Sequence, residues 1–90
     1  MIECKDTVKG LDYIGNLNIT KSGKSCQRWD SNTPHNTNKN EVKKENFPEK
    51  SIATAGNKCR NLVDNDSPWC YTTDPSTRWE YCDVPMCDGE

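Results

Sequence analysis

The chain has few apolar residues and no long apolar run. Only 31% of its 90 residues are hydrophobic, and no stretch is long or apolar enough to cross a membrane. No apolar pattern of helical period continues for three turns. The length fits one domain whose core must be small, so the fold needs a second source of stability.

The chain also has no excess of basic residues, and its first residues show no pattern of an export signal. A net charge of −2 argues against nucleic acid or heparin as the main partner. Met1-Ile2-Glu3 leads straight to Cys4, with no apolar segment of a signal peptide. We expect an expressed piece of a longer secreted or cell-surface protein, in which Met1 is an added start.

Close pairs of metal ligands are absent as well. There is no Cys-x-x-Cys motif and only one histidine, so zinc is not expected, and the sequence indicates no other cofactor. The six cysteines instead predict three disulfides and an oxidising compartment. Their spacing leaves fifteen pairings open. The cysteines are Cys4, Cys26, Cys59, Cys70, Cys82 and Cys87.

Turn-forming residues recur at short intervals, as in a loop-rich β fold. Residues 17–20 alternate apolar and polar and predict a short strand. Residues 36–50 predict a charged, solvated loop anchored by Val42 and Phe47. Asn18 begins an Asn-Ile-Thr triplet and is a candidate N-glycosylation site.

Aromatic residues, scarce elsewhere, are concentrated in residues 69–81. Trp69 and Tyr71 are two apart, as are Trp79 and Tyr81, and the residues between the two pairs predict a turn. Alternate side chains of a strand share a face, so a hairpin would carry all four rings on one side. Arg78 and Glu80 would lie on the other side or at its margin.

Two interpretations of this aromatic set remain open. The rings could form the core of a small protein. They could also line a half-exposed binding trough, since buried tryptophan and tyrosine need hydrogen-bond partners. Acidic residues precede them, Asp64 and Asp66, and Arg78 lies between them. Such a trough would suit an elongated zwitterion, with its ammonium on the carboxylates and its carboxylate on the guanidinium.

Several motifs together resemble a kringle domain over residues 4–87. They are "DYIGN" (12–16), "TKSGKSCQRW" (20–29), "TPH" (33–35), "CRN" (59–61), "PWCYTTDP" (68–75) and "RWEYCDVPMC" (78–87). The resemblance implies a small disulfide-rich fold, mainly irregular and β, with short antiparallel strands. It also implies a disulfide pairing of first to sixth, second to fourth and third to fifth cysteine. That pairing is Cys4–Cys87, Cys26–Cys70 and Cys59–Cys82.

The resemblance is strongest to the lysine-binding kringles of plasminogen and apolipoprotein(a), which bind lysine side chains and ω-amino acids. It implies that Trp69 and Trp79 hold the methylene chain of such a ligand. Tyr71 matches the aromatic floor of the trough and Tyr81 a further lining residue. Arg78 matches the main cationic residue for the ligand carboxylate.

The acidic end departs from the family pattern, which is Cys-Arg-Asn-Pro-Asp-x-Asp. Here the Asp-x-Asp pair, Asp64 and Asp66, lies one residue later after Cys59. If the loop adjusts, these two residues take the acidic roles. If it does not, Val63 and Asn65 occupy those places.

The resemblance implies roles for four further positions. Lys39 matches a secondary cationic position, Trp29 a core position and His35 a structural one. The family's core leucine is absent upstream of the third cysteine, and Ile52 or Ala55 is expected to replace it.

The sequence therefore predicts a secreted or extracellular, monomeric binding module of residues 4–87, with residues 1–3 and 88–90 as flanking or linker segments. Its expected partners are proteins with exposed or C-terminal lysines and small ω-amino acids, without nucleic acid or membrane insertion. The alternative is a structural or receptor-type kringle without a working lysine site. The module could also target a larger protease, but an independent enzyme is not expected.

Overall fold

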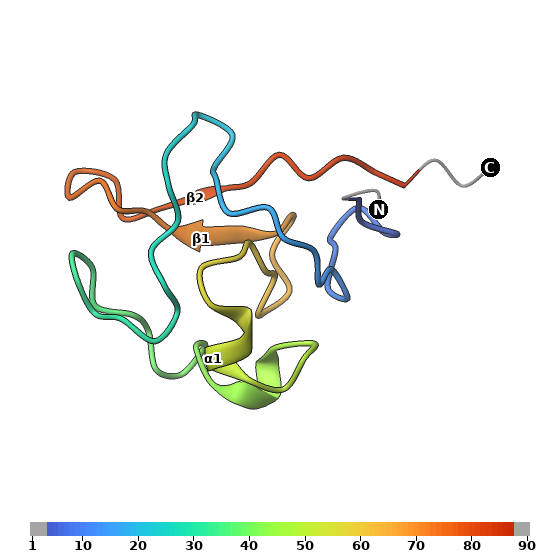
Figure 1. The fold of residues 1–90 in the computed structure, drawn as a ribbon. Helices are drawn as coiled ribbons and strands as arrows, with labels where there is room; N and C mark the ends of the chain where they lie inside the picture. The colour runs from blue at the N-terminus through green and yellow to red at the C-terminus, as the bar shows by residue number, and fades with distance from the viewer. Residues whose placement is uncertain (1–3, 88–90) are drawn as a thin grey trace.

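The computed structural model describes residues 4–87, of which few form regular secondary structure. Two strands, β1 (Trp69–Tyr71) and β2 (Trp79–Tyr81), form one antiparallel hairpin. The described part also contains a 3-10 helix, η1 (Lys44–Asn46), and a single helical turn, α1 (Ile52–Ala55). Irregular loops surround the hairpin (Figure 1), so the predicted fold class is confirmed.

Three disulfides form the covalent frame. They are Cys4–Cys87, Cys26–Cys70 and Cys59–Cys82, the pairing that the resemblance implies. The Cα atoms of Cys4 and Cys87 are 4.9 Å apart, so the two ends of the described chain lie side by side (Figure 1). The predicted flanking segments, 1–3 and 88–90, lie outside the described residues.

The two inner disulfides cross in the centre of the domain. The sulfurs of Cys26, Cys59, Cys70 and Cys82 all lie within 4.8 Å of one another, and none of these residues is more than 3% exposed. Four clustered cysteines would suit a metal only as thiolates. All six cysteines of the chain are disulfide-bonded, so this cluster is a covalent part of the core.

Trp29 is the centre of the apolar core, as predicted. It is 1% exposed, and its ring meets those of Phe47, Trp69 and Tyr71 edge-to-face at centroid distances of 5.5, 5.2 and 5.9 Å. Its indole Nε1 donates to the carbonyl of Lys58 at 2.7 Å. The core therefore combines a large aromatic surface with an indole N–H that has a hydrogen-bond acceptor.

The long loop of residues 36–50 is anchored as predicted. Val42 and Phe47 are 5% and 0% exposed, whereas most of the loop is exposed. Downstream, Ala55 of α1 is fully buried and Ile52 packs half-buried against the core. Both residues therefore contribute apolar surface to the core, and the replacement of the family's leucine by either of them stays a prediction.

The strand predicted at residues 17–20 is wrong. Ile19 forms only an isolated bridge with Ser25. The chain turns back immediately, because the N–H of Thr20 donates to the carbonyl of Lys24 at 2.8 Å. Gly23 has a φ of +90°, a conformation that glycine adopts readily. The pairing is therefore too short for a strand.

A buried ion pair joins the long loop to the segment after α1. The guanidinium of Arg60 donates from Nε and Nη2 to the carboxylate of Glu49, with contacts of 3.1 and 2.9 Å to Oε2. The two side chains are only 3% and 8% exposed. Nη1 of Arg60 also donates to the carbonyls of Gly15 and Cys59, at 2.9 and 2.6 Å. The charges are thus both paired and hydrogen-bonded.

Candidate functional site

The four rings of the hairpin share one face, as predicted. Trp69 pairs with Tyr81 across the strands and Tyr71 with Trp79, while Cys70 pairs with Glu80 on the opposite face. The rings form a continuous edge-to-face series. Centroid distances are 5.2 Å for Trp69–Tyr71, 5.8 Å for Trp69–Trp79 and 5.0 Å for Trp79–Tyr81.

The four rings differ in exposure to solvent, so the core interpretation is confirmed for two of them and the binding interpretation stays a prediction. Trp69 and Tyr71 are each 3% exposed and belong to the core, whereas Trp79 is 43% exposed. The Trp69 Nε1 is buried and has no hydrogen-bond acceptor among residues 4–87. Buried donors without partners are rare in folded proteins. The indole N–H of Trp69 is such a donor on this face of the hairpin.

A groove of about 240 Å³ opens on this face. Three hairpin rings line it, with one cation, one carboxylate and two amides. The lining residues are Trp69, Tyr71, Trp79, Arg78, Glu41, Asn38 and Asn65. The groove therefore combines aromatic faces with charged and amide groups of the kind that orient a bound ligand.

Arg78 lies in the groove rather than on the back of the hairpin. Its Cζ is 5.2 Å from the centroid of the Tyr71 ring, a cation–π contact. Its guanidinium forms no ion pair with any residue of the described range 4–87. The Tyr71 hydroxyl accepts from the backbone N–H of Asn38 at 3.0 Å, which fixes the ring beneath the cation. Arg78 therefore keeps its donors free for a carboxylate.

Asn65 occupies the wall of the groove where the sequence left two alternatives open. The buried Asn61 determines this: its Nδ2 donates to the carbonyls of Asn65 and Lys9, at 2.7 and 2.8 Å. Its Oδ1 accepts from the N–H of Asn65 at 3.2 Å. A register shift of one residue in this loop would break these hydrogen bonds. Asn65 is therefore the residue of this loop that lines the groove.

Asp64 and Asp66 are not among the residues that line the groove. The Asp64 carboxylate instead accepts from Lys9 Nζ at 2.7 Å, in an exposed ion pair that raises the pKa of Lys9. Asp66 is exposed, and Val63 is half-buried outside the groove. The role of Asp64 and Asp66 as partners of a ligand ammonium stays a prediction. Neither residue lines the groove, so this arrangement offers no direct contact with a ligand inside it.

Two further predicted residues also lie outside the groove. Lys39 Nζ donates to Asn32 Oδ1 at 2.7 Å and to Thr37 Oγ1 at 2.5 Å. Tyr81 is half-buried and packs edge-to-face on Trp79, so it supports that ring. The structure thus gathers Trp69, Tyr71, Arg78 and Trp79 of the predicted set.

Sequence reasoning missed Glu41, the carboxylate of the groove. It is half-buried and belongs to the long loop, next to the buried Val42. Only that buried neighbour distinguished Glu41 from the other charges of the loop, and the resemblance places no ligand-binding acid there.

The disulfides, the aromatic core and the groove on the hairpin face define a small binding module. A family model described as "Kringle domain" matches residues 4–87. The chain therefore belongs to the kringle family. Kringles are non-catalytic protein-binding modules, and those with disulfides are typically extracellular. Within residues 4–87, no helix has the length and apolar character needed to span a bilayer.

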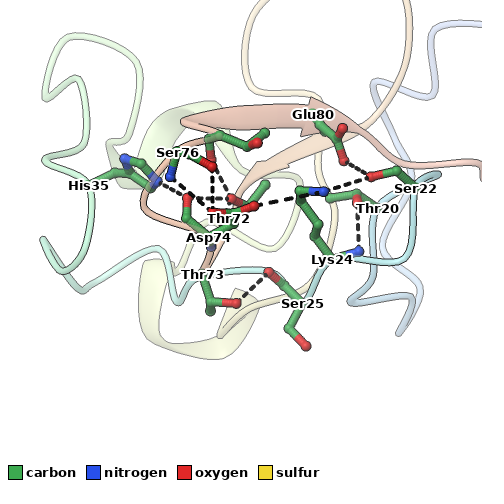
Figure 2. A network of polar contacts seen from close by, with 11 residues as sticks. Thr20, Ser22, Lys24, Ser25, His35, Thr72, Thr73, Asp74, Ser76 and Glu80 are labelled. Atoms are coloured by element: carbon green, nitrogen blue, oxygen red, sulfur yellow. Dashed lines mark hydrogen bonds and ion pairs between the residues drawn. The ribbon is translucent and has the colours of Figure 1, made fainter.

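The opposite face of the hairpin carries a polar network (Figure 2). The Glu80 carboxylate accepts from Ser22 Oγ at 2.6 Å, which lowers the pKa of Glu80. His35 Nε2 lies 2.8 Å from the carbonyl of Asp74, and its backbone N–H donates to Gln27. These contacts agree with a structural role for His35. They attach the hairpin turn to the loops behind it.

The Asp74 carboxylate caps the hairpin turn and gives a testable acid dependence. Its Oδ1 accepts from the N–H and Oγ of Ser76, at 2.9 and 2.8 Å, and these bonds lower the pKa of Asp74 (Figure 2). Since the folded pKa lies below the unfolded one, ionised Asp74 stabilises the fold above the unfolded pKa. This contribution is lost as the pH falls through the folded pKa.

Ser76→Ala is expected to raise the pKa of Asp74 only part of the way to its ordinary value, because the backbone bond remains. An NMR titration of the Asp74 carboxyl carbon measures this change. Ser25→Ala is the control. The backbone carbonyl of Ser25 accepts from Thr73 Oγ1, and this substitution leaves the carbonyl in place. An unchanged Asp74 pKa in Ser76→Ala would contradict the assigned cause.

Proposed function

We propose that this kringle is a non-catalytic module that binds lysine side chains, C-terminal lysines and small ω-amino acids in the aromatic groove. The observation that carries the proposal is the unpaired Arg78 guanidinium beside the exposed Trp79 in that groove. The ligand's methylene chain packs on the tryptophans, and its carboxylate meets Arg78. The ammonium of the ligand is directed to the acidic residues in and around the groove.

The same proposal covers the setting of the module. Its partners are proteins that present lysines outside the cell, and it acts as a monomer in a secreted or cell-surface chain. Asn18 has an exposed side chain and remains the predicted glycosylation site. Neither nucleic acid nor membrane insertion forms part of the function.

A titration with 6-aminohexanoic acid tests the proposal. Saturable changes in tryptophan fluorescence and in the Trp69 and Trp79 indole N–H signals are expected. Arg78→Ala should weaken this ligand roughly tenfold but leave hexylamine, which has no carboxylate, unaffected. No saturation up to millimolar ligand would overturn lysine binding.

A receptor-type kringle that contacts its partner without a lysine site is the second candidate. The amide of Asn65 in the groove wall and the pairing of Asp64 with Lys9 favour it. The two functions differ in one measurement. Free 6-aminohexanoic acid would displace a protein partner from a lysine site and would leave a receptor-type contact intact.

A further inference from the structure

Glu41 places an unpartnered carboxylate in the groove. It lines the same space as Trp69, Trp79 and Arg78. Within the described residues 4–87, its carboxylate takes part in no hydrogen bond or ion pair. A half-buried acid without a partner holds unused capacity for a cation or a hydrogen-bond donor.

The backbone of Glu41 is fixed although its carboxylate is free. Its N–H donates to the carbonyl of Asn38 at 2.9 Å, and its carbonyl accepts from Asn46 Nδ2 at 2.9 Å. The next residue, Val42, is 5% exposed and anchors the loop. Glu41 is therefore held at the groove by its neighbours, and its backbone loses little conformational entropy when a ligand binds.

Glu41 and Arg78 have opposite charges in one groove and yet form no ion pair with each other. Two opposite charges in direct contact would satisfy each other and leave nothing for a ligand. Because they form no ion pair, both charges remain available to a molecule that carries an ammonium and a carboxylate.

We propose that Glu41 supplies the carboxylate that receives the ammonium group of the ligand, a role that rests on the proposed lysine-binding function. Recognition of the ammonium then belongs to the long loop of residues 36–50. Asp64 and Asp66 act only from outside the groove, as exposed charges that water and salt screen. Specificity for ω-amino acids over plain carboxylates depends on Glu41.

Variants of two glutamates of the same loop test this inference. Glu41→Gln is expected to weaken 6-aminohexanoic acid roughly tenfold, since it removes a charge-assisted hydrogen bond. Glu45→Gln removes the same charge from exposed η1, away from the groove, and should change the affinity less than about twofold. Hexanoic acid has no ammonium and should bind wild type and Glu41→Gln alike. Near-ultraviolet circular dichroism checks that each variant is folded.

Each outcome separates the inference from the function on which it rests. If wild type binds and only Asp64→Asn with Asp66→Asn weakens the ligand, Glu41 is not the ammonium site, although lysine binding stands. An unchanged affinity in both Glu41→Gln and the double variant also overturns the role of Glu41. If wild type does not bind 6-aminohexanoic acid at all, the proposed function and this inference both fall.

Discussion

Reduction of all three disulfides is expected to unfold the domain at room temperature. The bonds join residues 83, 44 and 23 positions apart. In the chain-entropy model, loops of these lengths stabilise the fold by about 3–5 kcal/mol each. A chain of this size has a free energy of unfolding of about 5–13 kcal/mol in total. Loss of the three constraints therefore removes most or all of the stability.

Near-ultraviolet circular dichroism in excess reductant measures this loss, because the signal depends on the fixed packing of Trp29 and Trp69. Iodoacetamide without reductant is the control, since a chain whose six cysteines are all disulfide-bonded has no thiol to react. A reduced domain that kept its near-ultraviolet spectrum would show that apolar packing alone suffices.

Replacement of Glu49 by alanine is expected to lower the free energy of unfolding by about 3–5 kcal/mol. The substitution leaves Arg60, whose side chain is 3% exposed, as a buried charge without its carboxylate. The two backbone carbonyls that Arg60 also contacts supply only partial charges. Urea unfolding of the oxidised protein measures the change.

The exposed Arg28–Asp30 pair offers a matched control. Its N–O distance of 2.9 Å equals that of the Arg60–Glu49 pair, but its side chains are 54% and 44% exposed. Asp30→Ala should cost less than about 1 kcal/mol, because water replaces the lost partner. Equal effects of Asp30→Ala and Glu49→Ala would contradict the importance of burial.

The hairpin and its aromatic face could be predicted because the signal is local. Tryptophan and tyrosine alternate on both sides of a turn, and the period of a strand then decides which rings share a face. The anchoring of the long loop by Val42 and Phe47 followed from their apolar character in a polar segment, whereas the core position of Trp29 followed from the family resemblance. The disulfide pairing needed the family resemblance, since spacing alone left it open.

The walls of the groove could not be predicted because they depend on contacts between distant segments. The hydrogen bonds of Asn61 to Lys9 and Asn65 decide which residue of the loop faces the rings. Glu41 and Glu49 belong to a loop that the sequence indicates to be solvated. Their burial follows from how Val42 and Phe47 anchor that loop, and no local pattern encodes the result.

The Cys4–Cys87 bond has a mechanical consequence. It connects the two ends of the described chain across a Cα separation of 4.9 Å. A pulling force applied at residues 4 and 87 would pass along this covalent link and leave the hairpin and the groove unloaded. The module would resist extension until that bond is reduced, and reduction would then release only the segments that lie outside the loops still closed by Cys26–Cys70 and Cys59–Cys82.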